Sequence, residues 1–266
     1  MSGAEHTAWW QAREIKPGQS GHWQIGPLSV HARNAGTEWR FAWQFGDDPW
    51  QEALDFEIDD EPLPDTGALR RRFAMGNTGS RLQLQPRLAD RAVMVMPETD
   101  MSLPADEHCL LYIASPLWLA ISAGPGLDRE LMELPVTRLS DTWFGPNTRE
   151  GTLCYSLRTR ARTRADRIEP VAHRAITPLT IHNRSKQPLE LTQLRVPMNA
   201  LGLYQHRDKT LWSDAVTLTH EGDSNMAAVH VRHGAGREGA RGELIAGPRE
   251  TLERNTVIRA FSQLFS

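Results

Sequence analysis

Four arginines repeat at every second position in the middle of the chain. Residues 152–164 alternate in the manner of a β-strand, and this period of two places Arg158, Arg160, Arg162 and Arg164 on one face of a sheet. Guanidinium groups form paired hydrogen bonds with carboxylates and phosphates. The row therefore indicates a binding site for phosphate, an acidic lipid headgroup or an acidic partner, although a solvated strand face gives the same pattern.

An acidic segment is available to balance this row. Residues 47–61 contain eight acidic residues and no basic one, and Asp55, Glu57, Asp59 and Glu61 share one strand parity. Like charges placed opposite each other on a sheet repel by a few tenths to about 1 kcal/mol. The favoured interpretation is that the acidic and arginine rows face each other, within one chain or between two copies, and anion binding is the alternative.

A second group of candidate binding residues lies on a loop. Residues 143–151 supply an indole from Trp143, an amide from Asn147 and two charges from Arg149 and Glu150. Binding sites are often built on such exposed connections. The Pro and Gly residues of the loop are equally typical of a plain turn.

Three histidines near the end of the chain raise the question of a metal site. A tight turn at residues 223–224 would pair His230 with Thr217 and spread His220, His230 and His233 along a hairpin. Because the imidazoles would not converge, we predict no metal site. The sequence also lacks phosphate-loop, nucleophile-elbow and zinc-protease motifs, so no cofactor is expected and an enzyme is the less favoured class.

The composition of the chain limits which classes of function remain. The net charge of −3 and pI of 6.4 provide no general attraction for nucleic acid. Cys109 and Cys154 lack the spacing of a zinc or redox motif, so they are expected to be buried free thiols. The first residues do not resemble a signal peptide, and the apolar residues 109–123 are too few to cross a bilayer. We expect a cytoplasmic protein that does not insert into membranes.

The strongest structural signal is an aromatic row. In residues 38–45, Trp39, Phe41, Trp43 and Phe45 alternate with polar or small side chains. This pattern predicts a strand whose aromatic face packs in a core, although exposed rings would suit a sugar.

Short strands separated by Pro, Gly and polar turns recur along the rest of the chain, which favours a mainly β fold built from antiparallel sandwich units. We predict an N-terminal β unit over residues 1–130 and an immunoglobulin-like unit over residues 131–266. Short helices are expected at residues 4–14 and 248–265.

Several strand and turn patterns occur in an order that resembles domain-of-unknown-function family 432, an uncharacterised prokaryotic family. These patterns are Pro116-Leu-Trp-Leu-Ala-Ile-Ser122, Phe144-Gly-Pro, Gly151-x-Leu-Cys-Tyr155 and Leu179-x-Ile-x-Asn183. The resemblance covers mainly residues 110–200 and transfers no active site. It implies a cytoplasmic bacterial or archaeal protein, sometimes encoded beside small-conductance mechanosensitive channels.

Taken together, these features favour a protein-interaction or accessory module that binds another protein or a second copy of itself, with a channel link implied only by the resemblance. One alternative is a module that binds carbohydrate or a small anion. The other is an enzyme with an unrecognised site.

Overall fold

The computed structural model describes residues 9–65, 67–222, 225–234, 242–253 and 255–262. Strands account for 55% of the chain and helices for 2%, which confirms the mainly β prediction. The helical part consists of two short 3-10 turns, η1 (Ala165–Arg167) and η2 (Met198–Ala200).

The contacts divide the chain into two compact units. Unit 1 consists of Met1–Arg87 and Leu117–Arg138, and unit 2 consists of Leu88–Pro116 and Leu139–Ser266. The chain therefore passes between the units three times, whereas the sequence suggests one boundary near residue 130. The two divisions differ over residues 131–138 and over residues 88–116, and the strands of the latter pair with later parts of the chain in unit 2.

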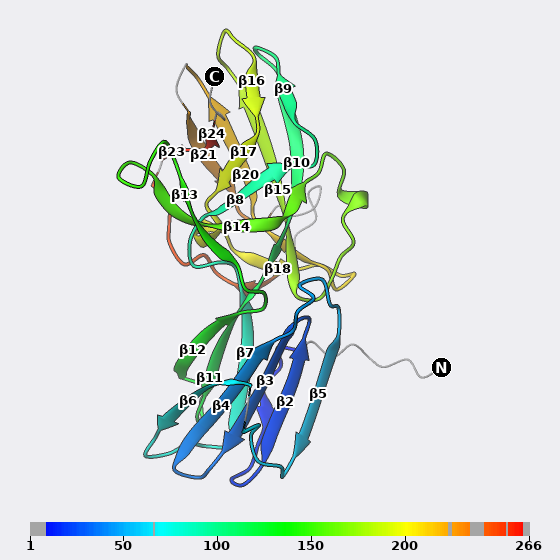
Figure 1. The fold of residues 1–266 in the computed structure, drawn as a ribbon, viewed down its shortest axis with the longest axis vertical. Coiled ribbons are helices and arrows are strands. Elements are labelled where there is room, and N and C mark those ends of the chain that lie inside the picture. Colours follow the sequence, from blue (N-terminus) through cyan, green and yellow to red (C-terminus); the bar gives the residue numbers. More distant parts are fainter. Residues whose placement is uncertain (1–8, 66, 223–224, 235–241, 254, 263–266) are drawn as a thin grey trace. The chain divides into compact units, whose positions relative to one another are not determined.

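Unit 1 contains two antiparallel sheets (Figure 1). The five-stranded sheet has the order β5 (Leu54–Asp59), β2 (Ser20–Ile25), β3 (Leu28–Asn34), β4 (Glu38–Phe45) and β6 (Leu69–Ala74). The four-stranded sheet has the order β1 (Arg13–Glu14), β7 (Arg81–Arg87), β11 (Trp118–Ala123) and β12 (Arg129–Pro135). In the five-stranded sheet, β5 and β6 are therefore the two edge strands.

The aromatic row lies on β4, whose bounds match the predicted strand. Trp39 is 0% exposed and Phe41 is 1% exposed, so the expected burial is confirmed for these two rings. The indole Nε1 of Trp39 donates a hydrogen bond to the carbonyl of Thr78 at 3.0 Å, which satisfies its polar atom. Trp43 and Phe45 are only partly buried, because they lie towards the open end of the sheet.

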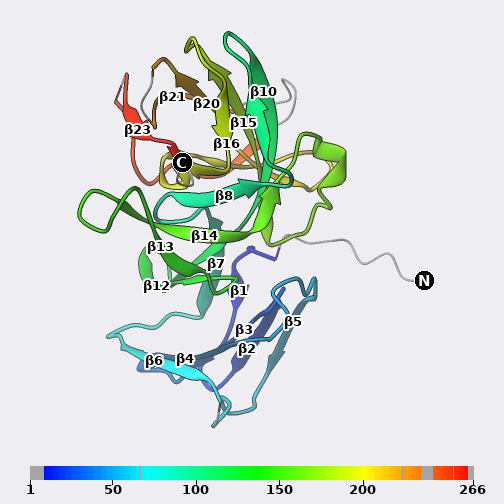
Figure 2. The same cartoon turned by 45° about the horizontal axis from the view of Figure 1, so that its top comes forward.

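Unit 2 contains sheets of eight, five and two strands (Figure 2). The eight-stranded sheet has the order β22 (Glu243–Ala246), β18 (Leu203–Gln205), β19 (Leu211–Ser213), β15 (Arg174–Asn183), β20 (Ala215–His220), β21 (Met226–Arg232) and β23 (Val257–Arg259), with β10 (His108–Pro116) also paired to β15. The five-stranded sheet has the order β13 (Ser140–Phe144), β14 (Thr152–Ala161), β8 (Val93–Pro97), β17 (Gln193–Val196) and β24 (Phe261–Ser262). The remaining pair is β16 (Leu189–Leu191) with β9 (Met101–Leu103).

Several neighbours in unit 2 run parallel. Strand β15 is parallel to β19 and β20, and β14 is parallel to β8. Strand β15 pairs with β10, β19 and β20. Its first six residues are all buried, which is typical of a strand covered on both faces. The immunoglobulin-like arrangement expected for this half is not confirmed, since that arrangement uses antiparallel sheets.

The helix expected at residues 248–265 is wrong for the described part of this segment. Strand β23 pairs with β21, and β24 pairs with β17, so the chain end completes two sheet edges. A short segment gains more from ladder hydrogen bonds and burial than from a marginal helix. At the other end, residues 9–12 form a turn and bend before β1, and residues 1–8 lie outside the described residues.

Candidate functional site

Only Arg158 and Arg160 of the arginine row lie on β14, because the strand ends at Ala161, before Arg162 and Arg164, and an irregularity also interrupts it. Arg158 and Arg160 are exposed, whereas Cys154 is buried although it has the same parity. The cause is a register shift between Ser156 and Arg160 in the pairing of β14 with β8. A bulge of this kind changes which residues face the core, so Cys154 is buried before it and Arg158 and Arg160 are exposed.

Arg162 and Arg164 form ion pairs near the end of the row. Arg162 Nε lies 3.5 Å from Oε1 of Glu98, and Arg164 Nε donates to Oδ1 of Asp166 at 2.9 Å. Both carboxylates belong to unit 2, whereas the acidic segment 47–61 belongs to unit 1. These two arginines therefore have acidic partners close by within unit 2.

The loop between β13 and β14 is a compact turn. The side-chain oxygen of Asn147 accepts hydrogen bonds from the backbone N–H groups of Arg149 at 2.9 Å and Glu150 at 3.0 Å, so it holds the turn together. A Cβ atom on Gly145 would lie 2.7 Å from the Cα of Gly151, which explains why the loop closes on glycines. The charged side chains of Arg149 and Glu150 are exposed.

Trp143 precedes this turn and is 49% exposed. The extended chain from Gly151 to Arg158 spans roughly 20 Å at the usual rise per residue of a strand. The loop candidates and the exposed arginines therefore lie at different ends of β14 and do not form one site.

Arg164 borders a pocket of about 540 Å³ that also includes Asp166, Tyr112 and Trp212. The two aromatic rings meet edge to face, with centroids 6.4 Å apart and planes at 88°, and are only 9% and 4% exposed. A sugar stacks on an open ring face. Since these two rings are covered, and Trp39 of the aromatic row is covered too, none of the three offers an open face to a sugar.

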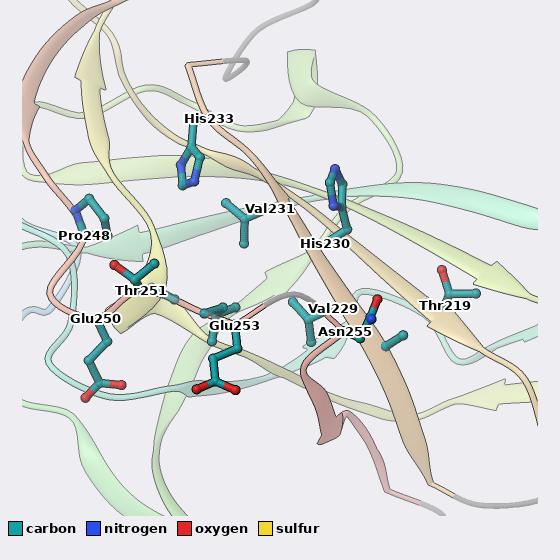
Figure 3. Close-up of a pocket in the computed structure, with 13 residues that line it drawn as sticks. Thr219, Val229, His230, Val231, His233, Pro248, Glu250, Thr251, Glu253 and Asn255 are labelled. Atoms are coloured by element: carbon teal, nitrogen blue, oxygen red, sulfur yellow. The ribbon is translucent and has the colours of Figure 1, made fainter.

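The histidines lie along a hairpin, as predicted. His230 is opposite Thr217, which confirms the expected register. His230 and His233 border a pocket of about 740 Å³, and Figure 3 shows the carboxylates of Glu250 and Glu253 directed away from the two imidazoles. Within the described residues, no three His, Cys, Asp or Glu side chains converge in a way that could hold a metal ion.

A basic pocket that the sequence reading did not identify lies in unit 1. It has a volume of about 360 Å³, and its lining combines arginines with apolar groups and one carboxylate. The lining residues are Arg33, Arg40, Phe41, Pro62, Leu63, Asp65, Arg70, Arg71 and Arg72. We call it the arginine pocket.

Sheet register gathers these arginines from three neighbouring strands. Arg33 on β3 lies opposite Arg40 on β4, which lies opposite Arg72 on β6. Arg70 lies two residues before Arg72 and therefore points to the same face. Directly opposite side chains on an antiparallel sheet have Cβ atoms about 5 Å apart, so the row concentrates positive charge.

Glu38 balances part of this charge. Its carboxylate, 10% exposed, accepts hydrogen bonds from Arg40 Nε at 2.6 Å and Arg72 Nε at 2.9 Å. The hydrogen bonds from Arg40 and then Arg72 lower the pKa of Glu38 below its usual value. One carboxylate therefore orients two guanidiniums and leaves their remaining N–H groups available.

Residues 60–65, which we call the strap, cover one side of the pocket. They leave β5 at one edge of the sheet and lead towards β6 at the other. Arg33 Nη1 donates to the carbonyls of Asp60 at 3.1 Å and Glu61 at 2.7 Å, and Arg70 donates to the carbonyl of Pro64. The arginines thus hold the strap mainly through neutral acceptors, which do not cancel their charge.

The pocket carries an excess of positive charge. Five arginines and one carboxylate line it, Glu38 pairs with two of these arginines, and the side chain of the lining residue Asp65 is 94% exposed. Among the described residues, neither Arg33 nor Arg71 has a carboxylate within ion-pair distance. The arrangement can accept an anion on several oriented donors.

The sequence contained a partial signal for this pocket. The run from Arg70 to Arg72 follows the acidic segment and is visible by inspection. Arg33 and Arg40 give no such signal, because they reach the run only through the pairing of β3, β4 and β6.

No helix in the described ranges is long and apolar enough to cross a membrane. Comparison with curated proteins and with solved structures gives no match to either set. A family model described as "Protein of unknown function (DUF432)" matches residues 9–266, which extends the resemblance from the middle of the chain to both units. The chain therefore belongs to the DUF432 family.

Proposed function

We propose that unit 1 binds a small organic anion, carrying a carboxylate or phosphate group, in the arginine pocket. The observation that carries this proposal is the convergence of Arg33, Arg40, Arg70 and Arg72 on one face of the sheet, where Glu38 on β4 orients Arg40 and Arg72. Planar guanidiniums suit carboxylate and phosphate oxygens because they present two parallel N–H groups.

The lining also suggests the size and character of the ligand. A volume of about 360 Å³ is near the lower end of the range for small-molecule sites. Pro62 and Leu63 on the strap add apolar surface beside the guanidiniums. A metabolite-sized anion with a short carbon skeleton fits this combination better than a bare inorganic ion does.

The residues that line the pocket fit the binding of a ligand better than they fit catalysis. Guanidiniums and apolar groups make up most of it, and Asp65 is too exposed to be held in a fixed position. We therefore propose an accessory role in the cytoplasm, in which anion binding on unit 1 accompanies an interaction with another protein. A link to a mechanosensitive channel is one form of this proposal that the family resemblance suggests.

Calorimetric titration of the full chain at low salt tests the proposal. The probes are inorganic phosphate, succinate, citrate and a sugar phosphate, with an uncharged sugar as the negative control. We expect saturable binding of at least one organic anion, weakened about tenfold or more by Arg40→Gln or Arg70→Gln, because a hydrogen bond to a charged group contributes about 1.5–3 kcal/mol.

The matched control is Arg158→Gln with Arg160→Gln, which removes two exposed arginines from unit 2 and should leave the affinity unchanged. The proposal is wrong if no organic anion binds saturably, or if the control weakens binding as much as the pocket variants do.

A further inference from the structure

The two edge strands of the five-stranded sheet in unit 1 carry opposite charges. Strand β5 has the sequence LDFEID and β6 has the sequence LRRRFA. Strand β5 pairs only with β2, and β6 pairs only with β4, among the described residues. Each strand therefore presents one free edge, and most of its side chains are exposed.

The free edges offer backbone hydrogen-bonding groups at matching spacing. Gly26 N–H donates to the carbonyl of Ala53, and Met75 N–H donates to the carbonyl of Thr37, which identifies the hydrogen-bonded positions of the two ladders. Because these positions alternate in antiparallel pairs, the intervening residues direct their N–H and C=O groups outwards. On the two edges these are Leu54, Phe56 and Ile58, and Arg70, Arg72 and Ala74, of which the Phe56 N–H also donates to Oδ1 of Asp55 at 2.8 Å.

The acidic side chains of β5 and two of the three arginines of β6 lie on the same face of the sheet. Glu57 is opposite His22, His22 is opposite His31, and Ala42 connects that row to Arg70. Opposite residues share a face, so the acidic row of β5 and Arg70 and Arg72 of β6 point to the face that bears the strap.

The other face of both edges carries exposed apolar groups. Ile58 on β5 is 41% exposed and Leu69 on β6 is 52% exposed. An edge that meets its counterpart would therefore bring acid beside arginine on one face, and the apolar groups of β5 beside Leu69, Arg71 and Phe73 on the other.

We propose that β5 of one copy of this chain pairs with β6 of a second copy and extends the five-stranded sheet from molecule to molecule. Following the antiparallel pairings across the sheet, β5 and β6 run in the same direction. A second copy placed edge to edge with the same face upwards forms a parallel pair, with Asp55, Glu57 and Asp59 beside Arg70 and Arg72.

The charges also disfavour the competing contacts. Two copies of β5 would place acid opposite acid, and two copies of β6 would place arginine opposite arginine, and such like-charge pairs are unfavourable. The contact is therefore heterologous, and it leaves a free acidic edge at one end and a free basic edge at the other. A six-residue edge buries little surface, so the association is weak and depends on concentration and salt.

Sedimentation velocity of the full chain over a wide concentration range tests this inference. We expect the wild type to self-associate at low salt and to dissociate at about 0.5 M NaCl, where charges are screened within a few ångströms. The acidic-edge variant, Asp55→Lys with Glu57→Lys, and the basic-edge variant, Arg70→Glu with Arg72→Glu, should each remain monomeric.

An equimolar mixture of the two variants supplies the decisive measurement. Each variant has two edges of one sign, so the mixture should associate even though neither component does. This recovery also shows that both variants are folded. A wild type that stays monomeric at the highest concentration and lowest salt would overturn the inference, as would a mixture that behaves like its separate components.

The acidic-edge variant keeps every arginine of the pocket. It should lose self-association while retaining anion binding, which separates this inference from the proposed function. If the basic-edge variant does not fold, Arg70→Gln with Arg72→Gln replaces it, because this variant removes the two positive charges without adding negative ones. Its self-association must be weaker and less sensitive to salt than that of the wild type.

Discussion

The imidazole rings of His22 and His31 stack on neighbouring strands, with centroids 4.1 Å apart and planes 5° apart. The hydroxyl of Ser29 lies 3.1 Å from Nε2 of His22 and 3.3 Å from Nε2 of His31, so it bridges the two rings. Burial, and then the charge of His22, lower the pKa of His31 to about 4, although Asp59 acts in the opposite direction.

This pair predicts a loss of stability in mild acid. The folded pKa of His31 lies below its unfolded value of about 6.5, so the unfolded chain binds more protons between the two values. The free energy of unfolding should therefore fall as the pH decreases from about 6.5 to about 4. An NMR titration should place His31 near pH 4, and His22→Gln should raise that value. Titration of His31 at its ordinary pKa would contradict the prediction.

Asp214 is a buried hydrogen-bond acceptor in unit 2. We expect the free energy of unfolding to depend more on Asp214 than on the other polar residues of that unit. Its side chain is 0% exposed and accepts hydrogen bonds from Gly202 N–H at 2.7 Å, Gly234 N–H at 2.7 Å and His233 Nδ1 at 2.9 Å. Asp214→Ala leaves these donors unsatisfied and should cost about 2–4 kcal/mol in urea unfolding.

His233→Ala is the matched control for Asp214. The His233 side chain is 63% exposed, so its removal should cost less than about 1 kcal/mol. Equal losses for the two variants would show that the buried backbone donors contribute little.

The two thiols should react slowly in the folded protein. Burial raises the pKa of Cys154 to about 11, and burial also raises the pKa of Cys109. At pH 8 only about a thousandth of Cys154 is then thiolate, which is the reactive form. Labelling with Ellman's reagent should be slow until guanidinium unfolds the chain. Rapid labelling of both cysteines without denaturant would contradict this expectation.

Aromatic side chains in the core and on the loop should differ in their contribution to stability. Phe41 is 1% exposed, and Phe41→Ala should cost about 3–5 kcal/mol because it removes packing and leaves a cavity. Trp143 is 49% exposed, so Trp143→Ala should cost less than about 1 kcal/mol. Chemical unfolding of the two variants at one pH measures the difference.

Local patterns predicted local structure well. The alternation of Trp39 and Phe41 with smaller residues identified β4, and the position of a turn near residue 223 was enough to pair His230 with Thr217. In both cases the outcome depends on the period of a strand or the geometry of a hairpin, which neighbouring residues determine.

Features that depend on residues far apart in the sequence could not be predicted from local patterns. The irregularity in β14 separates the buried Cys154 from the exposed arginines, and it occurs in the parallel pairing with β8, a strand about sixty residues earlier in the chain. The arginine pocket requires Arg33 and Arg72 to meet through β4. The final residues form strands because sheet edges are available to them, and nothing in their own periodicity indicates those edges.

The chain passes between the two units three times, and this order of segments has a consequence for biosynthesis. Unit 1 can complete both of its sheets once residue 138 has left the ribosome, because all its strands have then been made. Strands β8, β9 and β10 emerge before that point, but their partners β14, β16 and β15 are translated later. The nascent chain must therefore carry three unpaired strands while unit 1 folds, and this interval is where a chaperone would protect it from aggregation.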